Sequence, residues 1–166
     1  AHSYFFDVSR NGRVMLLAAD TGKVASDFNP YRVEDGTNPV LLPCSEEIAL
    51  ARVNPVSLSG DGSVGVGWME FADGTGTGVL WPSADVAVRL GAFSSDEWIN
   101  PLGISRDGKM IVGSVAPGNP FAMSVSTLVA EPLTTVRGWA SDASGDGAVI
   151  VGVLSPAKSG FSGFRW

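Results

Sequence analysis

Gly103-Ile-Ser-Arg-Asp-Gly-Lys-Met-Ile-Val-Gly113 is the stretch that decides the fold, because copies of it recur along the chain. Each copy has a Ser, then an Asp-Gly or Asn-Gly pair, then a short apolar run. In three copies that run ends on another Gly, whereas the first copy has Leu17 there. The motif residues are Ser9, Asn11, Gly12, Ser59, Asp61, Gly62, Ser105, Asp107, Gly108, Ser144, Asp146 and Gly147.

The Asp-Gly and Asn-Gly pairs between apolar runs predict β-hairpins. A two-residue type I′ turn needs positive φ at both central residues, which Asn, Asp and Gly tolerate. The preceding Ser can form a hydrogen bond with the turn backbone, and a Gly inside a strand usually marks the close approach of another backbone. We therefore expect four equivalent strand–turn–strand elements that point to the same side of the molecule.

The spacing of the motifs predicts an all-β, β-propeller-like fold. The turn glycines follow one another at steps of 50, 46 and 39 residues, and periods of about 40–50 residues with about four strands each are typical of propeller blades. A second landmark stands 19 residues after the turn Gly, at Tyr31, Trp81 and Trp166. We expect one repeat domain, 1–166, with units at approximately 1–50, 51–97, 98–136 and 137–166.

The last unit is expected to be an incomplete blade. The chain stops at Trp166, after what would be the third strand of that unit, so residues 160–166 should form an open edge. Such an edge invites pairing with another chain, which predicts either self-association or a longer parent polypeptide. The one helix candidate is 45–52, which has Ser45 as an N-cap, acids in its first turn and Arg52 at its end.

The composition favours many turns and excludes some partners. Charged residues make up 17% of the 166 residues, with 21 Gly and 10 Pro, which fits an all-β protein. A net charge of −6 with scattered Lys and Arg argues against a nucleic-acid partner. The apolar runs are too short for a membrane span, and no signal peptide is present, although one could have been removed.

At the repeat motifs the chain resembles the bacterial extracellular repeats of the HAF family. Their units read approximately Ser-x-Asp-Gly-x-x-Val-Val-Gly, followed by a variable loop and an Ala-Phe-x-Trp-like strand. The matching pieces here are 105–113, 144–152 and 163–166, with a looser match at 79–81. The resemblance implies a secreted or surface-exposed protein without a known reaction. Similar hairpins also occur in WD40-like and TolB-like blades.

The candidates for chemistry each have a simpler structural interpretation. His2 is the only histidine and Cys44 the only cysteine, which argues against Ser–His–Asp chemistry, a His-rich metal site and an internal disulfide. Residues 60–65 match G-x-G-x-x-G, but a β run follows where a dinucleotide site needs a helix. Each acidic turn offers one carboxylate, which is too few for calcium, and the loop with Glu70 and Asp73 is a slightly better calcium candidate than the turns. No cofactor or metal is expected.

The tryptophans are the strongest candidates for a ligand site. Trp81 and Trp166 follow the repeat and are expected to pack between blades. Trp98, Trp139 and Trp68 are the candidate binding residues, because exposed aromatic rings near one rim can stack on sugars or anchor a partner.

Three functions remain open from the sequence. The favoured one is a secreted or surface-exposed, non-catalytic interaction or structural module. The second is a carbohydrate-binding module. The third is a glycan-active hydrolase that would use Asp96, Glu97 and acids on neighbouring rims, because a glycosidase needs two carboxylates across a cleft.

Overall fold

The computed structural model describes residues 2–20, 28–44, 50–71, 73–91, 98–116, 118–156 and 160–166. Within them the chain forms four antiparallel sheets and no helix. The first sheet contains β1 (Ser3–Val8), β2 (Val14–Asp20), β3 (Phe28–Glu34) and β4 (Val40–Leu41), and the second contains β5 (Leu50–Leu58), β6 (Gly65–Phe71), β7 (Gly76–Ser83) and β8 (Val86–Arg89). The third contains β9 (Ile99–Ile104), β10 (Met110–Val115), β11 (Asn119–Ser124) and β12 (Ala130–Pro132), and the fourth contains β13 (Gly138–Ala143), β14 (Ile150–Leu154) and β15 (Ser162–Arg165).

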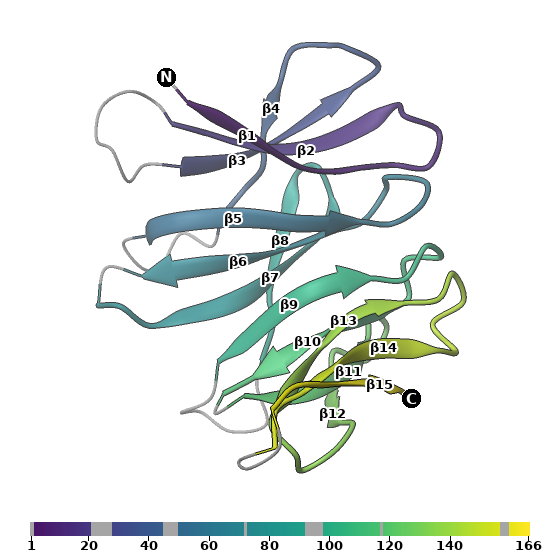
Figure 1. Cartoon of the computed structure of the whole chain (residues 1–166). Helices are drawn as coiled ribbons and strands as arrows, with labels where there is room; N and C mark the ends of the chain where they lie inside the picture. Colours follow the sequence, from purple (N-terminus) through teal and green to yellow (C-terminus); the bar gives the residue numbers. More distant parts are fainter. Residues whose placement is uncertain are drawn as a thin grey trace.

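The four sheets follow one another as successive blades, in chain order (Figure 1). The hairpins β1–β2, β5–β6, β9–β10 and β13–β14 all turn on the same side, at the right of Figure 1, as the repeat predicts. The fold is therefore all-β and propeller-like, with three four-stranded blades and a last blade of three strands. The prediction of the fold class is confirmed, including the incomplete last blade.

Each core cluster lies between two successive blades. Leu16 of the first blade packs with Trp81 and Met69 of the second, and the Trp81 indole N–H donates to the carbonyl of Pro43 at 2.8 Å. The second and third blades share a cluster that contains Val66 and Ile111. A smaller cluster joins the third and fourth blades. Burial of these faces is the main favourable term that holds one blade against the next.

The turns differ from the expected type I′ geometry. In all four, the Gly N–H donates to the Ser carbonyl three residues earlier, at 2.9 Å. The glycines have φ of 71° to 77°. Asn11, Asp61, Asp107 and Asp146, however, are absent from the positive-φ residues of the described chain. The reason is the length of the loop. The Ser N–H donates to the carbonyl five residues later, as Ser105 does to Met110, so each loop has four residues instead of two. Loops of this length are most often built around a type I turn, in which the Asp or Asn keeps negative φ.

Two further sequence predictions need correction. Residues 50–52 belong to β5, so the helix expected over 45–52 is wrong there, because Leu50 and Arg52 pair with β6; residues 45–49 lie outside the described part. The landmark 19 residues after the turn is also out of register in the first blade. In the second blade, Trp81 pairs with Gly65, which stands three residues after the turn Gly. In the first blade the residue three after the turn Gly is Met15, and it pairs with Val33 instead of Tyr31.

A β-bulge recurs in the first strand of every blade, and the sequence analysis missed it. The ladder skips one residue in each case, and that residue stands six positions before the turn Gly. The bulge residues are Phe6, Val56, Leu102 and Ser141. A bulge bends its strand and changes where nearby side chains point.

The Gly at the end of the repeat motif is explained by this bulge. A Cβ on Gly113 would lie 2.1 Å from the carbonyl oxygen of Asn100, and one on Gly152 would lie 2.2 Å from that of Trp139. Gly67 meets the carbonyl of Asn54 at 2.5 Å in the same way. In blades two to four the bulged strand therefore approaches the middle strand too closely for a side chain at this position, whereas the first blade has the same bulge and accommodates Leu17 there.

Replacing Gly113 by Ala should destabilise the protein by roughly 1–3 kcal/mol or more, because the obstacle is backbone rather than a movable side chain. Gly91→Ala is the matched control, since a Cβ at Gly91 meets no heavy atom within 4 Å. Urea unfolding of both variants measures the difference. Equal midpoints would show that the bulge does not press on Gly113.

Candidate functional site

The first strand of every blade is an edge strand, and the four together border an open groove. β1, β5, β9 and β13 each stand at the end of their sheet. The groove measures about 620 Å³ and is lined by residues of all four blades. Its lining includes Asp7, Arg10, Val56, Ser57, Leu102, Arg106, Ser141 and Asp142. An edge strand has backbone N–H and C=O groups that are free to bind another chain.

The recurring bulges shape this groove. Three of the four bulge residues, Val56, Leu102 and Ser141, line it directly, and Asp7 follows the fourth. A bulge leaves its extra residue without a ladder partner, so each blade presents unpaired backbone there. The same bulge thus recurs in each of the four strands that border the groove, with a different side chain in each strand.

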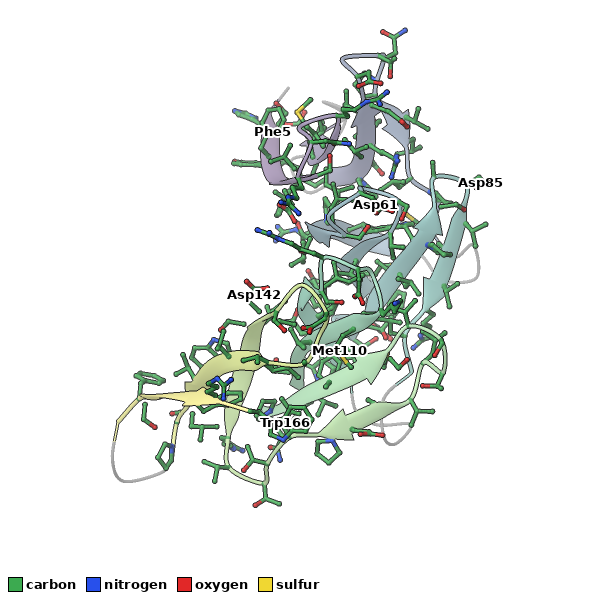
Figure 2. The ribbon with its side chains drawn as sticks, turned by 90° about the vertical axis from the view of Figure 1, so that its right-hand side faces the viewer. Phe5, Asp61, Asp85, Met110, Asp142 and Trp166 are labelled. Carbon is green, nitrogen blue, oxygen red and sulfur yellow. The ribbon has the colours of Figure 1, made fainter. Side chains whose placement is uncertain are left out.

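Two carboxylates in the groove have different surroundings. Asp7 accepts hydrogen bonds from the Ser57 hydroxyl at 3.0 Å and from the Leu58 N–H at 2.8 Å, so it ties β1 to β5. Asp142 is exposed and accepts a hydrogen bond from the adjacent N–H of Ala143 at 2.8 Å. Figure 2 shows Asp142 between Phe5 at one end of the molecule and Trp166 near the other. Asp7 is a structural link, while Asp142 can accept from a ligand.

Two arginines stand at the mouth of the groove. Arg10 and Arg106 are exposed and line both the groove and a neighbouring hollow beside Asp61. Neither belongs to one of the ion pairs that the described residues form. A guanidinium presents its donors in a planar fork that matches a carboxylate or phosphate. The mouth of the groove can therefore recognise an anionic group.

The turns carry one hydrogen-bond network, repeated four times. The Ser hydroxyl donates to the Asp or Asn side chain at 2.6–2.8 Å. The same hydroxyl oxygen accepts from the N–H five residues later at 2.9–3.0 Å. The Asp or Asn oxygen in turn accepts the N–H two residues on, at 2.9–3.1 Å. Because these donors favour the charged carboxylate, they hold the pKa of Asp61 at about 2 and lower the pKa of Asp107 and Asp146.

The turns are also joined from blade to blade. The N–H of Arg10 donates to the carbonyl of Gly60 at 2.9 Å, and the N–H of Gly60 donates to that of Arg106 at 2.8 Å. The N–H of Asp107 then donates to the carbonyl of Gly145 at 2.9 Å. We call this series the turn ladder. It fixes the spacing of the blades on the side where the groove opens.

The candidate tryptophans do not form one platform. Trp98 and Trp68 lie together, with ring centroids 6.1 Å apart, whereas Trp139 packs edge-on against Phe161 in the last blade. Trp98 is 45% exposed and borders a second hollow of about 500 Å³ with Asn100 and Ser114. The buried Nε1 of Trp68 lacks a hydrogen-bond partner in the described part of the chain.

The two tryptophans that stand 19 residues after a turn Gly differ in burial. Trp81 is buried between the first two blades, as expected. Trp166 is exposed, and the prediction that it packs between blades is wrong, because its neighbour Phe164 takes the place against the third blade. The backbone of Trp166 still pairs with Ile150, at 2.8 and 2.9 Å.

The remaining sequence candidates stay apart. His2 is exposed beside Asp20, at 3.1 Å, and burial raises the pKa of the Cys44 thiol, which lowers its reactivity at neutral pH. Asp73 accepts from the N–H and hydroxyl of Thr75, as in a turn. Residues 60–65 form the β5–β6 turn and the start of β6. Asp96 and Glu97 lie outside the described residues.

Within the described ranges, no three His, Cys, Asp or Glu side chains gather as a metal would require. The same part of the chain contains no helix long and apolar enough to cross a membrane.

Three features define a β-propeller-type repeat domain: hairpins at the same position in every repeat, apolar cores between successive blades, and a groove along the first strand of each blade. Among solved structures, the chain is similar to a protein described as TolB from Agrobacterium tumefaciens, with a TM-score of 0.67, 19% identity, and coverage of 99% of this chain and 57% of that chain. It is also similar to TolB from Acinetobacter baumannii (TM-score 0.64, 16% identity, 99% and 40% coverage). A puromycin hydrolase mutant complexed with PGG gives a TM-score of 0.63 at 16% identity, with 98% and 27% coverage.

These similarities show the fold. The chain spans 57% or less of the length of each of these three neighbours. A scan against protein-family models and a search of curated proteins find no match.

Replacing Asp61 by Asn should remove part of the acid sensitivity of the protein. Asn11 occupies the same place in the first turn and makes the same bonds, so the variant should fold at neutral pH. Because the folded pKa of Asp61, about 2, lies below the usual value for Asp, the charged carboxylate stabilises the fold above about pH 4. That stability is lost as the pH falls through about 2.

The measurement is urea unfolding of wild type and variant from pH 2 to pH 6. The advantage of the wild type over Asp61→Asn should be constant above about pH 5 and should shrink as the pH falls. A difference that does not change with pH would contradict the role assigned to the carboxylate.

Proposed function

We propose that this chain is a non-catalytic interaction domain of a secreted or surface-exposed protein, and that it binds a protein partner in the groove of the inner strands. The observation that carries the proposal is the groove itself, since all four blades contribute bulged edge strands to it. A propeller-type fold, as in the structural neighbours, supports it. The location is proposed from the resemblance of the repeats to HAF units.

The chemistry of the groove favours an extended polypeptide with acidic side chains. The free backbone groups at the bulges can bind a peptide backbone, as edge strands do. Ser57 and Ser141 add hydroxyls, and the guanidinium groups of Arg10 and Arg106 can pair with carboxylates at the mouth. Charge-assisted hydrogen bonds of this kind are the stronger ones.

A second candidate is the carbohydrate-binding module, and one observation favours it. Trp98 is half-exposed beside a hollow with Asn100 and Ser114, and an aromatic face with nearby polar groups can stack on a sugar ring. The hydrolase alternative would need paired carboxylates in a cleft. The described residues that line the hollow beside Trp98 include no acidic side chain.

Selection of a phage-displayed random peptide library on the immobilised chain tests the first candidate. Enriched peptides should contain Asp or Glu, and their affinity should fall about tenfold or more for Arg106→Ala, since a charge-assisted hydrogen bond contributes about 1.5–3 kcal/mol. Ser141→Trp, which fills the groove, should abolish binding. Lys109→Gln is the control, because Lys109 is an exposed cation on the same turn as Arg106 but does not line the groove.

A glycan array and a reducing-sugar assay separate the alternatives. Glycan binding that is lost in Trp98→Ala but kept in Ser141→Trp would favour the carbohydrate-binding module. Release of reducing sugar from any arrayed glycan would overturn the non-catalytic proposal.

A further inference from the structure

The position after the turn Ser alternates between Arg and Gly from blade to blade. In chain order it is Arg10, Gly60, Arg106 and Gly145. The turn ladder joins the first three, since the Arg10 N–H donates to the Gly60 carbonyl at 2.9 Å and the Gly60 N–H donates to the Arg106 carbonyl at 2.8 Å. Hydrogen-bonded extended chains stand about 4.8 Å apart, so the backbones of the two arginines lie about 10 Å from each other, with a glycine between them.

Gly60 keeps the space between the two arginines open. A Cβ on Gly60 would lie 3.0 Å from the carbonyl oxygen of Arg106 and 3.2 Å from its Cβ, so a side chain there would press on Arg106. The space is instead a hollow of about 470 Å³, which we call the rim hollow. It is lined by Arg10, Asn11, Gly60, Asp61 and Arg106, and it shares Arg10, Gly60 and Arg106 with the groove.

Asn11 brings a hydrogen-bond donor to the rim hollow. The other three turns have Asp at this position. The Oδ1 of Asn11 accepts from the Ser9 hydroxyl at 2.8 Å and from the Arg13 N–H at 3.0 Å. Because a backbone N–H only donates, the amide oxygen is the atom bonded within the turn, and the NH₂ group is left without a partner in the described residues. An Asp would have a second carboxylate oxygen in place of that donor.

Asp61 supplies an acceptor to the same hollow. Its Oδ1 accepts from the Ser59 hydroxyl at 2.7 Å and from the N–H and hydroxyl of Ser63 at 2.9 and 2.8 Å. Its Oδ2 has no partner within the described part of the chain, and the carboxyl is ionised at neutral pH because its pKa is about 2. The lining of the rim hollow therefore carries two positive charges and one negative charge, which a ligand group with one negative charge balances.

The last residue of a polypeptide has the groups that this hollow fits. It offers one carboxylate for the two guanidinium groups and, next to it, its own backbone N–H for the free oxygen of Asp61. A doubly charged phosphate would leave an unbalanced negative charge beside Asp61. Because edge strands bind a ligand through its backbone, the ligand's main chain reaches the open space over Gly60. Capture of a C-terminal carboxylate is a recurring mode of peptide recognition.

We propose that the rim hollow binds the C-terminal carboxylate of the extended polypeptide assigned to the groove, an inference that rests on the proposed function. Arg10 and Arg106 donate to the carboxylate from two sides, and the Asn11 NH₂ group donates to it from the first turn. The rest of the ligand extends along the edge strands of the groove. A peptide without a free C-terminus places an Asp or Glu side chain in the hollow instead, at lower affinity.

The test uses two libraries of the same short random peptides, one with a free C-terminal carboxylate and one with a C-terminal amide. Peptides retained by the immobilised chain are identified by mass spectrometry and resynthesised in both forms, and their affinities are measured by fluorescence anisotropy. The amide should bind about tenfold or more weakly, because it removes the charge that the guanidinium groups recognise. Arg10→Ala should weaken the free acid more than the amide, whereas a merely structural role would weaken both equally.

Asn11→Asp is the most specific variant. Asp occupies this position in the other three turns with the same hydrogen bonds, so the variant should fold, as urea unfolding at neutral pH will check. Its second carboxylate oxygen would face the bound carboxylate, and the affinity of the free acid should fall about tenfold or more. Asp146→Asn is the matched control, since it exchanges the same two residue types in a turn that lines neither the rim hollow nor the groove.

Equal binding of the acid and amide forms, with both lost in Ser141→Trp, would overturn this inference and leave the proposed function standing. Binding of the free acid that is unchanged in Asn11→Asp would also overturn it, since the carboxylate would then lie elsewhere. If the chain retains no peptide from either library, both the inference and the proposed function are wrong.

Discussion

The hydrogen-bond network of the four turns is the constraint on which the rest of this structure depends. One Ser hydroxyl in each turn donates to the Asp or Asn side chain and accepts the N–H five residues later, at or just before the start of the next strand. This leaves the backbone amide and carbonyl of the residue after the Ser pointing out of the hairpin. Those groups join the turn ladder in the second turn, where Gly60 accepts from Arg10 and donates to Arg106. The third turn accepts at Arg106 but donates through Asp107, two residues after its Ser. A local polar network thus sets the distance between blades, and the apolar clusters fill the space it defines.

The bulge in the first strand of each blade is the second feature that shapes this structure. It affects both the packing of the sheet and the candidate binding groove. In blades two to four the carbonyl opposite the motif's last Gly lies too close for a Cβ, as that of Asn100 does at Gly113, although the first blade has the bulge with Leu17 at this position. A strand would otherwise favour a β-branched residue there. The bulge also directs Leu102 and its counterparts into the groove. In blades two to four the bulge therefore leaves no room for a side chain on the neighbouring strand. It also leaves backbone groups unpaired in the groove, where a partner can bind.

Much of the fold could be predicted from the sequence, because turn chemistry and spacing are local. Ser105, Asp107 and Gly108 mark a hairpin without any knowledge of the rest of the chain, and recurrence at 39–50 residues indicates blades. The turn type could not be predicted, since it depends on where the hairpin closes, and Ser105 bonds to Met110 where a two-residue loop would pair Arg106 with Lys109. The helix expected near Arg52 failed because pairing with β6 overrides the helix signals there.

The candidate site was harder to predict, because it depends on contacts between units. Nothing in the stretch around Ser141 indicates a bulge until its register with β14 is known. A comparison of the four copies would not have found it either, since the bulge residues share a position but no residue type: they are Phe6, Val56, Leu102 and Ser141.

Amide hydrogen exchange at the turns measures whether the turn ladder sets the spacing of the blades. The N–H groups of Arg10, Gly60 and Asp107 lie outside the strands, yet each donates to the carbonyl of the next turn. If the turn ladder sets the spacing of the blades, these three amides should exchange as slowly as those of the neighbouring strands, and they should open together with the sheets. Exchange at the rate of an exposed loop, with the strand amides still protected, would show that the blades are held by their apolar faces alone and would contradict the account.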